Sequence, residues 1–412
     1  MSPANFTWDA LALDDFCPPD LRQQGKVTYK QKPLMALIAM ATLDAAVGPQ
    51  AIHDWGLADA KRIKRRFGWK KIPSASTIRI KLIDLDEDAM EKWIREVGSR
   101  LISRSSSKKR KEKDKKQKKA APPFNVIAMD GKTARRCHAS GKHAVHMLGA
   151  IDAAERIPLW QIEIGEKENE ITRALELLSH LPLRNTIVTS DAMHTQTKTS
   201  EAICGGGGHY IQIAKGNQNT LYEGIRQIFA PDPTESPWEK NEKAWTRQTA
   251  KTVEKGHGRI EVRELTVTTE LPWDDCWPHA KQCFEERRTR TVQGKTTTEV
   301  SYGITDMSEK EVDAAGLLAS TRAHWNVESW HWQLDMNFRE DELHIQNRKG
   351  AANMCRFLRL ACAIHIHGQA AGASGTRSVR SEKYFCGNSD ACMKYLEHSV
   401  KPEYSASRLL VN

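Results

Sequence analysis

Apolar positions divide this chain into a first part with helical periodicity and a second part in which strands and helices alternate. From Lys32 to Val47 the apolar residues suit a buried helix. Pro73 then ends one element and either Ser76 or Thr77 can cap the next, which predicts a short helix followed by another. Residues 1–103 are therefore expected to form an all-helical N-terminal domain.

The short helix leaves two interpretations open. Arg79 and Lys81 lie on it, and basic side chains on the second helix after a turn are typical of a helix-turn-helix that reads DNA. A packed helical bundle with ordinary surface charges produces the same pattern. The sequence does not choose between a DNA-binding and a structural N-terminal domain.

Residues 104–123 form the clearest linker, with almost no large apolar side chain and two prolines at the end. Within it, residues 108–119 hold nine basic and two acidic residues, a net +7 of the +10 that the whole chain carries. The run can bind phosphates by releasing counterions, or it can be a solvated, disordered spacer.

After the linker, three strands, a helix, a strand, a helix and a strand follow one another, which is the order of the ribonuclease H-like fold. The first strand ends in Asp130 and the fourth ends near Asp191, with a helix starting at Asn169 between them. The predicted fold class is therefore α/β, with a ribonuclease H-like catalytic domain over residues 124–368.

Residues 217–310 interrupt this alternation and are interpreted as a β-rich insertion, with a hairpin that turns near Gly294. From Ala314 to Gly368 the pattern is helical again, interrupted near Asn347 to Gly350. Residues 369–412 are expected to be a flexible link and a segment without an assigned structure.

Composition adds limits on compartment and partners. The longest apolar stretch, Leu34 to Leu43, is half of what a membrane span needs, at about 20 residues. The nine cysteines are scattered without metal-binding spacing, which fits reduced thiols in a cytoplasm, and the N-terminus lacks the pattern of a secretory signal. We therefore expect a cytoplasmic protein without membrane contact.

Two aspartates at strand ends are the first candidates for chemistry. Asp130 and Asp191 each stand where an apolar strand meets solvent. Two neighbouring carboxylates repel each other unless a cation neutralises them, and hard oxygen ligands favour Mg²⁺ or Mn²⁺. The alternative for each is a turn-former or a helix cap.

A third candidate lies on the helix after residue 314. His324, Glu328, His331 and Asp335 recur at four, three and four residues, which aligns them on one face. A polar stripe beside several aromatic residues indicates a partly buried site. The alternative is a solvated stripe on an amphipathic helix.

Eight sequence blocks are typical of one protein family: PSASTIR, DGKTAR, KENEIT, VTSDAMHTQ, YIQIAKGNQNTLY, EKGHGRIEVRE, AHWNVESWHWQLDMNFRED and NMCRFLRLA. In this order they resemble the DDE transposases of bacterial insertion sequences, in particular the ISAs-type group with the H-repeat-associated proteins. The resemblance runs from about Leu11 to about His367. It implies a ribonuclease H-like core with a β insertion, and Asp130, Asp191 and Glu328 as the catalytic, metal-binding acids.

The same resemblance implies Mg²⁺ as cofactor, with Mn²⁺ as a substitute. It implies double-stranded DNA as partner, both terminal inverted repeats and target, a homodimer in the DNA complex, and a bacterial, nucleoid-associated location. A related family carries a Tyr-x2-Arg-x3-Glu-x6-Lys signature, but Thr321, His324 and Asp335 stand at its other three places here. Its DNA-binding roles are therefore not transferred. Local candidates for DNA contact are Lys132, Lys215, His257, Arg259, Arg322, His324 and Arg339.

These observations favour a metal-dependent transposase that acts on the ends of its own element. Two other interpretations stay open. One is a domesticated nuclease with the same acids but without mobility, and the other is a DNA-binding protein whose catalysis has decayed. The retention of all three acids argues against the second.

Overall fold

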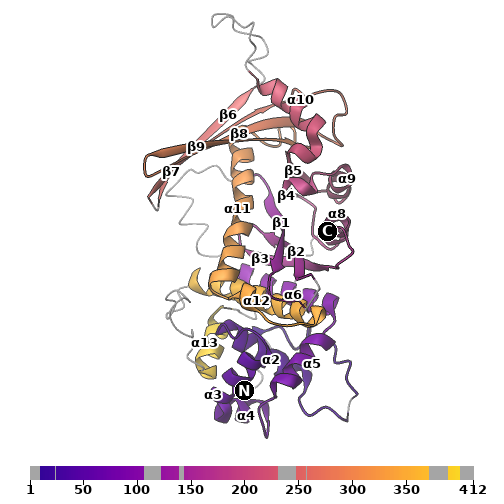
Figure 1. The fold of residues 1–412 in the computed structure, drawn as a ribbon, viewed down its shortest axis with the longest axis vertical. Helices are drawn as coiled ribbons and strands as arrows, with labels where there is room; N and C mark the ends of the chain where they lie inside the picture. Colours follow the sequence, from indigo (N-terminus) through magenta and orange to yellow (C-terminus); the bar gives the residue numbers. More distant parts are fainter. Residues whose placement is uncertain are drawn as a thin grey trace, which may run out of the picture.

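The computed structural model describes residues 10–23, 25–105, 122–138, 143–230, 247–256, 258–370 and 388–399. The basic run 108–119 and His257 lie outside the described residues. Figure 1 shows a helical part at one end, a sheet in the middle and the long strands of the insertion at the other end.

Among its described residues, the N-terminal part contains five helices: α2 (Gln31–Leu43), α3 (Pro49–Ala58), α4 (Ala60–Phe67), α5 (Ala75–Asp84) and α6 (Glu87–Ser105). In α2 every residue from Leu34 to Leu43 is buried, as the long apolar run predicted. The predicted cap of α5 was wrong: Ser74 is the N-cap, because its backbone is extended and its side chain accepts a hydrogen bond from the Thr77 amide. Lys81 is not a surface charge, since it is 1% exposed and lies 3.8 Å from Asp20.

The central sheet has nine strands in the order β3-β2-β1-β4-β5-β9-β8-β7-β6. Its first five strands and their helices are β1 (Asn125–Ala134), β2 (Val145–Asp152), β3 (Ile157–Ile164), α8 (Glu170–Ser179), β4 (Thr186–Ser190), α9 (Thr197–Gly205) and β5 (His209–Ala214). Strands β1, β2 and β3 pair antiparallel, whereas β4 lies parallel to β1 and β5. The ribonuclease H-like fold class predicted from the element order is confirmed.

Alternate residues of β1 face two separate cores. Val126 and Ala128 pack with apolar side chains of the long C-terminal helices, and Ile127 and Met129 pack with those of α8 and α9. Because side chains alternate along a strand, Asp130 shares the face of Val126 and Ala128 and is directed toward the C-terminal helices.

The insertion extends the sheet instead of forming a separate one. It contains α10 (Asn219–Phe229), β6 (Gln248–Gly256), β7 (Arg259–Thr268), β8 (Gln282–Val292) and β9 (Lys295–Thr305). Strand β9 pairs antiparallel with β5. The β8–β9 hairpin turns at Gln293 and Gly294, both with positive φ, as the sequence predicted. Helix α10 and strand β6 were not predicted from the sequence.

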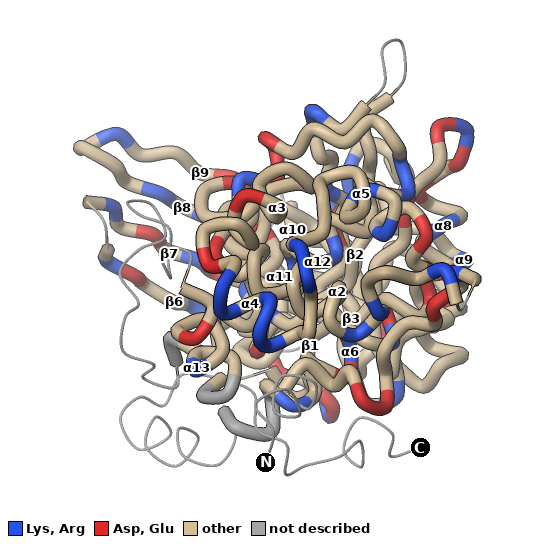
Figure 2. Tube along the Cα trace, turned by 90° about the horizontal axis from the view of Figure 1, so that it is seen from below, with Lys and Arg blue, Asp and Glu red and all other residues tan. Residues whose placement is uncertain are grey.

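The C-terminal part contains α11 (Ala314–Met336), the short 3-10 helix η4 (Glu340–Glu342), α12 (Arg348–Ala370) and α13 (Ser389–Ser399). The helical interruption was predicted near Asn347 to Gly350, but it begins at Asn337. Asn347 instead accepts a hydrogen bond from the Gly350 amide and so caps the start of α12. Helix α13, in the segment left unassigned, carries Asp390, which pairs with Arg62 and Arg66 of α4. Figure 2 shows α4 as a blue, basic run.

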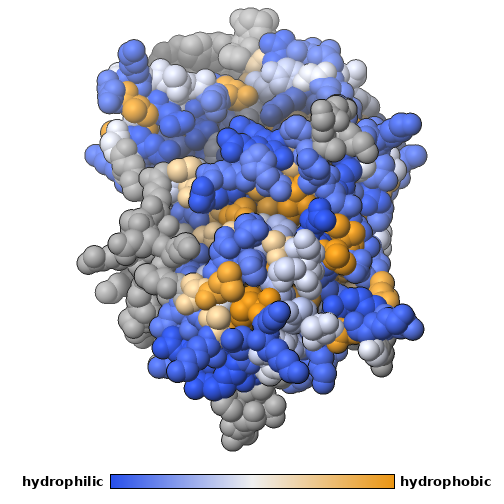
Figure 3. All heavy atoms as spheres, turned by 60° about the horizontal axis from the view of Figure 1, so that its bottom comes forward, coloured by the Kyte–Doolittle hydropathy of each residue, from blue (hydrophilic) through white to orange (hydrophobic). Residues whose placement is uncertain are grey.

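The face shown in Figure 3 is hydrophilic over most of its area, with small apolar patches between polar side chains. Within the described ranges, none of the helices combines the length and the apolar character needed to span a bilayer. The eight described cysteines are all free thiols.

Candidate active site

The two aspartates lie side by side because β4 is shorter than β1. The parallel pairing of the two strands stops at Met129 opposite Ser190. Asp130 and Asp191 are the next residues, Asp130 inside β1 and Asp191 directly after the end of β4, and paired strands lie roughly 4.8 Å apart. Asp130 was predicted at the end of its strand, and this was wrong, since β1 continues to Ala134 against β2. Only the β4 side of β1 becomes free at Asp130, and that opens the sheet edge to α11.

Helix α11 brings the third acid to the same place. Asp130, Asp191 and Glu328 all line one cleft between the ends of β1 and β4, the insertion strands and α11. Thr189, Lys215 and His324 line it as well. Residues from three distant parts of the sequence are therefore assembled at one site.

The acids differ in their surroundings. Asp130 Oδ1 accepts a hydrogen bond from the Gly131 amide at 2.8 Å, and Oδ2 lies 3.4 Å from His331 Nδ1. Burial raises the pKa of Asp130, but the hydrogen bond and charge of His331 outweigh it, so this pKa is lowered. Asp191 is more exposed, accepts from the Ala192 amide at 2.7 Å and lies 3.5 Å from Lys215 Nζ.

Glu328 behaves in the opposite way. Burial raises its pKa, and the nearby charge of Asp130 raises it further. Like charges therefore face each other across the cleft, which is the electrostatic condition that a bound cation relieves. Among the residues that the structure describes, however, no three His, Cys, Asp or Glu side chains are grouped closely enough to hold one ion together.

His324 contacts the sheet and not an acid. Its Nδ1 lies 3.0 Å from the Thr189 hydroxyl, whose Oγ1 is also 3.3 Å from the Ile127 carbonyl oxygen. Burial lowers the pKa of His324, although the charges of Asp130 and Asp191 oppose this effect. The imidazole is thus held against β4, one helical turn before Glu328.

The other residues predicted to contact DNA fall into two groups. Lys215 and Arg259 are exposed near the cleft and at the start of β7. Arg322 is paired with Glu254 at 2.6 Å, Arg339 is paired with Glu342, and Lys132 is paired with Asp335 at 2.6 Å. Lys132 was expected just after a strand end but lies inside β1, with its side chain 9% exposed. These three cations already have acidic partners.

The insertion supplies a wall of the cleft that sequence reasoning missed. Two guanidinium groups lie near the Trp325 ring, Arg263 at 4.9 Å and Arg288 at 4.2 Å from its centroid. Glu261 accepts hydrogen bonds from both arginines. Strand alternation placed Arg263 on one face, but nothing in the sequence indicated that this face turns toward α11.

A second missed cluster supports the turn after Asp191. Glu170 accepts a hydrogen bond from His146 and another from His194, each at 3.1 Å. Burial raises the pKa of Glu170, but these histidines outweigh it and lower that pKa to about 2. A Cβ at position 131 would approach within 2.8 Å of both His146 and Glu170, so glycine is needed beside Asp130. Glu170 and His194 both lie in the sequence blocks quoted above, which was the available signal.

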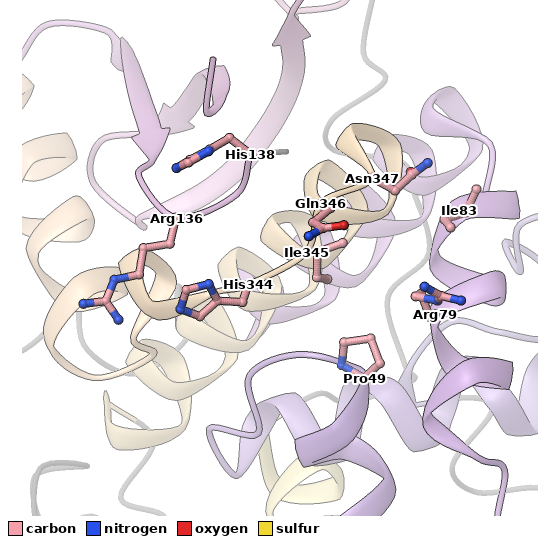
Figure 4. A pocket seen from close by; sticks show the side chains of 9 residues that line it. All are labelled: Pro49, Arg79, Ile83, Arg136, His138, His344, Ile345, Gln346 and Asn347. Atoms are coloured by element: carbon pink, nitrogen blue, oxygen red, sulfur yellow. The ribbon is translucent and has the colours of Figure 1, made fainter. Parts of the chain in front are cut away.

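A separate hollow lies where the N-terminal helices meet the end of β1 and the η4–α12 loop. Figure 4 shows Arg79 on one side, with Arg136, His138 and His344 on the other. None of the described residues that line this hollow is acidic. It is therefore a basic surface apart from the cleft of the three acids.

The ribonuclease H-like fold and its cleft of three acids agree with the protein family that this chain matches. A family model described as "Transposase DDE domain" matches residues 121–365, more than half of the chain, and a second, described as "DDE_Tnp_1-associated", matches residues 18–96. The chain therefore belongs to the DDE transposase family, as the sequence blocks indicated.

Several curated proteins are similar over most of their length. "Putative transposase YncI" of Escherichia coli O157:H7 is 28% identical over 81% of this chain and 81% of its own. "H repeat-associated putative transposase YhhI" of Escherichia coli K12 is 27% identical over 88% of this chain and 92% of its own. A chain in a solved piggyBac transposase synaptic complex with hairpin DNA is also similar. The match covers 96% of this chain and 78% of the piggyBac chain, with 10% sequence identity and a TM-score of 0.38.

Proposed function

We propose that this chain is a transposase that cuts and joins DNA at the ends of its own element, with Asp130, Asp191 and Glu328 as catalytic acids. The observation that carries the proposal is the assembly of these three acids from β1, β4 and α11 in one cleft of the transposase domain. These are the three acids that the family resemblance implies, and they come from segments far apart in the sequence.

The donor chemistry fits divalent metal ions. Carboxylate oxygens are the ligands that Mg²⁺ and Mn²⁺ prefer, and the mutual repulsion of Asp130 and Glu328 favours a cation between them. Two such ions stabilise both the attacking and the leaving oxygen of an in-line phosphoryl displacement when they are bound. Asp130, Asp191 and Glu328 would hold such ions, although among the described residues these side chains do not form a three-ligand cluster in this structure.

Other side chains of the cleft act on the DNA and on the acids. Lys215, 61% exposed and beside Asp191, can neutralise a phosphate that enters the cleft. Thr189 and His324 hold α11 against β4 and so orient the helix that carries Glu328. Water or a DNA 3′-hydroxyl attacks the phosphorus and breaks its bond to the 3′-oxygen of the attacked strand, which takes up the proton and leaves as a 3′-hydroxyl. Attack by water gives strand cleavage, and attack by a DNA 3′-hydroxyl gives strand transfer.

The partner is double-stranded DNA, comprising the terminal inverted repeats and a target, and the working form is a homodimer. Lys215 and Arg259 are exposed candidates for phosphate contact. Arg322 and Arg339 contribute less, because each is paired with a carboxylate outside the cleft, whereas Lys215 and its partner Asp191 both line the cleft. His257 stays a candidate from the sequence.

The decisive experiment changes each acid without changing its shape. Asp130→Asn, Asp191→Asn and Glu328→Gln are each expected to abolish Mg²⁺- or Mn²⁺-dependent nicking of DNA that carries the sequences flanking the gene, while DNA affinity survives. Asp274→Asn, an exposed aspartate outside the cleft, is the matched control and should cleave normally. Cleavage at the wild-type rate by any of the three variants removes that residue from the catalytic set.

The same assay separates the other interpretations. A wild-type chain that binds DNA but never cuts it with either ion is a decayed binding protein. Cleavage without preference for terminal inverted repeats favours a domesticated nuclease.

A further inference from the structure

The polar stripe on α11 has a member that the proposed function leaves without a role. Asp335 Oδ1 lies 2.6 Å from Lys132 Nζ on β1. Lys132 follows Asp130 by two residues, so both side chains lie on the same face of the strand. Asp335 follows Glu328 by seven residues, or about two turns, so both lie on the same face of the helix. One ion pair thus joins the two faces that carry two of the proposed catalytic acids.

The surroundings of this pair are acidic and largely shielded from water. The Lys132 side chain is 9% exposed, and its Nζ also lies 3.8 Å from Oε2 of the fully buried Glu340. That Oε2 atom has no hydrogen-bond partner among the described residues. The other oxygen of Glu340 lies 3.3 Å from Arg359, which donates to Gln161 of β3. Lys132 is therefore held by carboxylates from α11 and η4.

We infer that Lys132 and Asp335 are positioning residues, whose ion pair fixes β1 against α11 so that Asp130 and Glu328 face each other across the cleft. The inference rests on the proposed function. Lys132 does not line the cleft, and its low exposure leaves little of it for DNA. Between the acids and the pair, His331 Nδ1 lies 3.4 Å from Asp130 Oδ2. The stripe of α11 therefore contacts β1 at two successive points beside Glu328.

Neutralising either Lys132 or Asp335 should loosen the packing of α11 against β1. Without Lys132, the carboxylates of Asp335 and buried Glu340 lose the cation they share, and Arg359 alone remains to balance the charge of Glu340. Without the charge of Asp335, the Lys132 ammonium can turn toward Glu340 alone. Either change displaces Asp130 relative to Glu328, and metal affinity depends on that separation.

The test is a double-mutant cycle with Lys132→Met, Asp335→Asn and the combined variant. Mn²⁺ binding is measured by calorimetry without DNA, DNA affinity is measured without metal, and cleavage and thermal unfolding are measured in parallel. Each single change is expected to weaken Mn²⁺ binding and slow cleavage by about 10–100-fold, as is usual when a residue that orients metal ligands is replaced. DNA affinity should stay unchanged, and the double variant should be no worse than the worse single one, because the two residues act as a pair.

Two further variants keep the test decisive. Lys32→Met and Asp14→Asn break a surface pair of similar length, 2.8 Å, in the N-terminal part and should leave Mn²⁺ binding as in the wild type. Lys132→Arg keeps the charge and should retain Mn²⁺ binding. If Lys132→Met fails to fold, then Lys132→Arg and Asp335→Asn, at a partly exposed position, still compare a retained with a lost ion pair.

Several results would overturn the inference. Unchanged Mn²⁺ binding in Asp335→Asn shows that the pair positions nothing. A loss of DNA affinity in Lys132→Met alone, with a shallower salt dependence, shows a DNA contact instead. If the wild type binds Mn²⁺ and the variants match it, only this inference fails. If the wild type binds no Mn²⁺, the proposed function fails, and the inference fails with it.

Discussion

At the scale of single residues, the contact with Thr189 determines which ring nitrogen of His324 carries the hydrogen. The Thr189 hydroxyl has one hydrogen, and the Ile127 carbonyl oxygen at 3.3 Å accepts it. The contact at 3.0 Å is then donated by His324 Nδ1. In the neutral imidazole that burial favours, Nε2 carries no hydrogen. His324 therefore orients α11 without contributing a permanent positive charge.

We expect His324→Ala to slow DNA cleavage more than it weakens the binding of uncut DNA. Thr189→Val removes the same hydrogen bond from the other side with little change in shape, and should slow cleavage by about tenfold, as the loss of an orienting partner does. His324→Arg should keep some activity. Single-turnover cleavage and DNA affinity are the measurements, and an unchanged rate in the alanine variant would leave His324 without any role in the site.

A second histidine gives a prediction about stability. His365 of α12 is fully buried and its Nε2 donates to the Leu43 carbonyl oxygen at the end of α2, at 2.8 Å. Burial lowers the pKa of His365 to about 4. Since this folded-state pKa is below the unfolded value of about 6.5, the unfolded chain takes up the proton first as the pH falls. The stabilisation is complete above pH 6.5 and is lost between pH 6.5 and about pH 4.

His365→Gln keeps a donor for Leu43 and removes the titration. Between pH 7 and pH 5 the wild type should lose about 2 kcal/mol more of its unfolding free energy than the variant. Urea unfolding at several pH values measures this difference. Parallel pH profiles of the two proteins would show that His365 is not the group responsible.

At the scale of elements, the contact of α11 with the insertion depends on Arg322. Its guanidinium pairs with Glu254 at 2.6 Å and donates to Thr252 at 3.3 Å, both on β6. Strand β6 is the outermost strand of the sheet and pairs only with β7. The arginine therefore ties a sheet edge to the helix that carries Glu328.

Arg322→Gln and Glu254→Gln are expected to have the same effect, a looser outer edge of the insertion. Limited proteolysis should cut the β6–β7 region faster in both variants, while DNA affinity changes little in Arg322→Gln. Arg259→Gln, which removes an exposed cation from β7, is the contrasting variant and should weaken DNA binding without faster proteolysis. If Arg322→Gln weakens DNA binding and Glu254→Gln does not, Arg322 is a DNA contact.

Local sequence patterns predicted the elements that depend on their own residues and not on distant partners. The strand before Asp191, the helix predicted to start at Asn169 and the turn near Gly294 follow from apolar periodicity and turn chemistry, and the structure has all three. Helix α10 could also have been found, because Leu221, Ile225 and Phe229 are spaced by four residues and are buried. Strand β6 could not, since most of its residues are exposed and it forms only by pairing with β7.

The candidate site was predictable as a set of acids but not as an arrangement. Asp130 looked like a strand end because the apolar run stops there, whereas the strand continues on the β2 side alone. Lys132 was predicted to contact DNA, and its ion pair was missed because its partner Asp335 lies more than 200 residues away. Both errors concern contacts between distant segments, which hydrophobic periodicity does not encode.

At the scale of the whole molecule, the positive charge is unevenly distributed. The basic run 108–119 carries a net +7 of the total +10. Much of the basic surface elsewhere is already paired, as Arg62 and Arg66 are with Asp390 of α13. Among the described residues, no acidic side chain lines the hollow with Arg79 and Arg136, although the charge of Arg136 acts on Glu342. Electrostatic attraction to DNA should therefore come largely from the run.

Replacing residues 108–119 with an uncharged Gly-Ser segment of equal length is expected to weaken DNA binding and flatten its salt dependence, while the fold stays intact. Each phosphate neutralised on duplex DNA adds about 0.9 to the slope of log affinity against log salt, so the slope should fall by up to about 6. The slope that remains measures the folded surface, including Lys215, Arg259 and the basic hollow. Binding titrations over a range of salt concentrations, with circular dichroism to monitor the fold, decide the matter, and an unchanged slope would show that the run only connects α6 to β1.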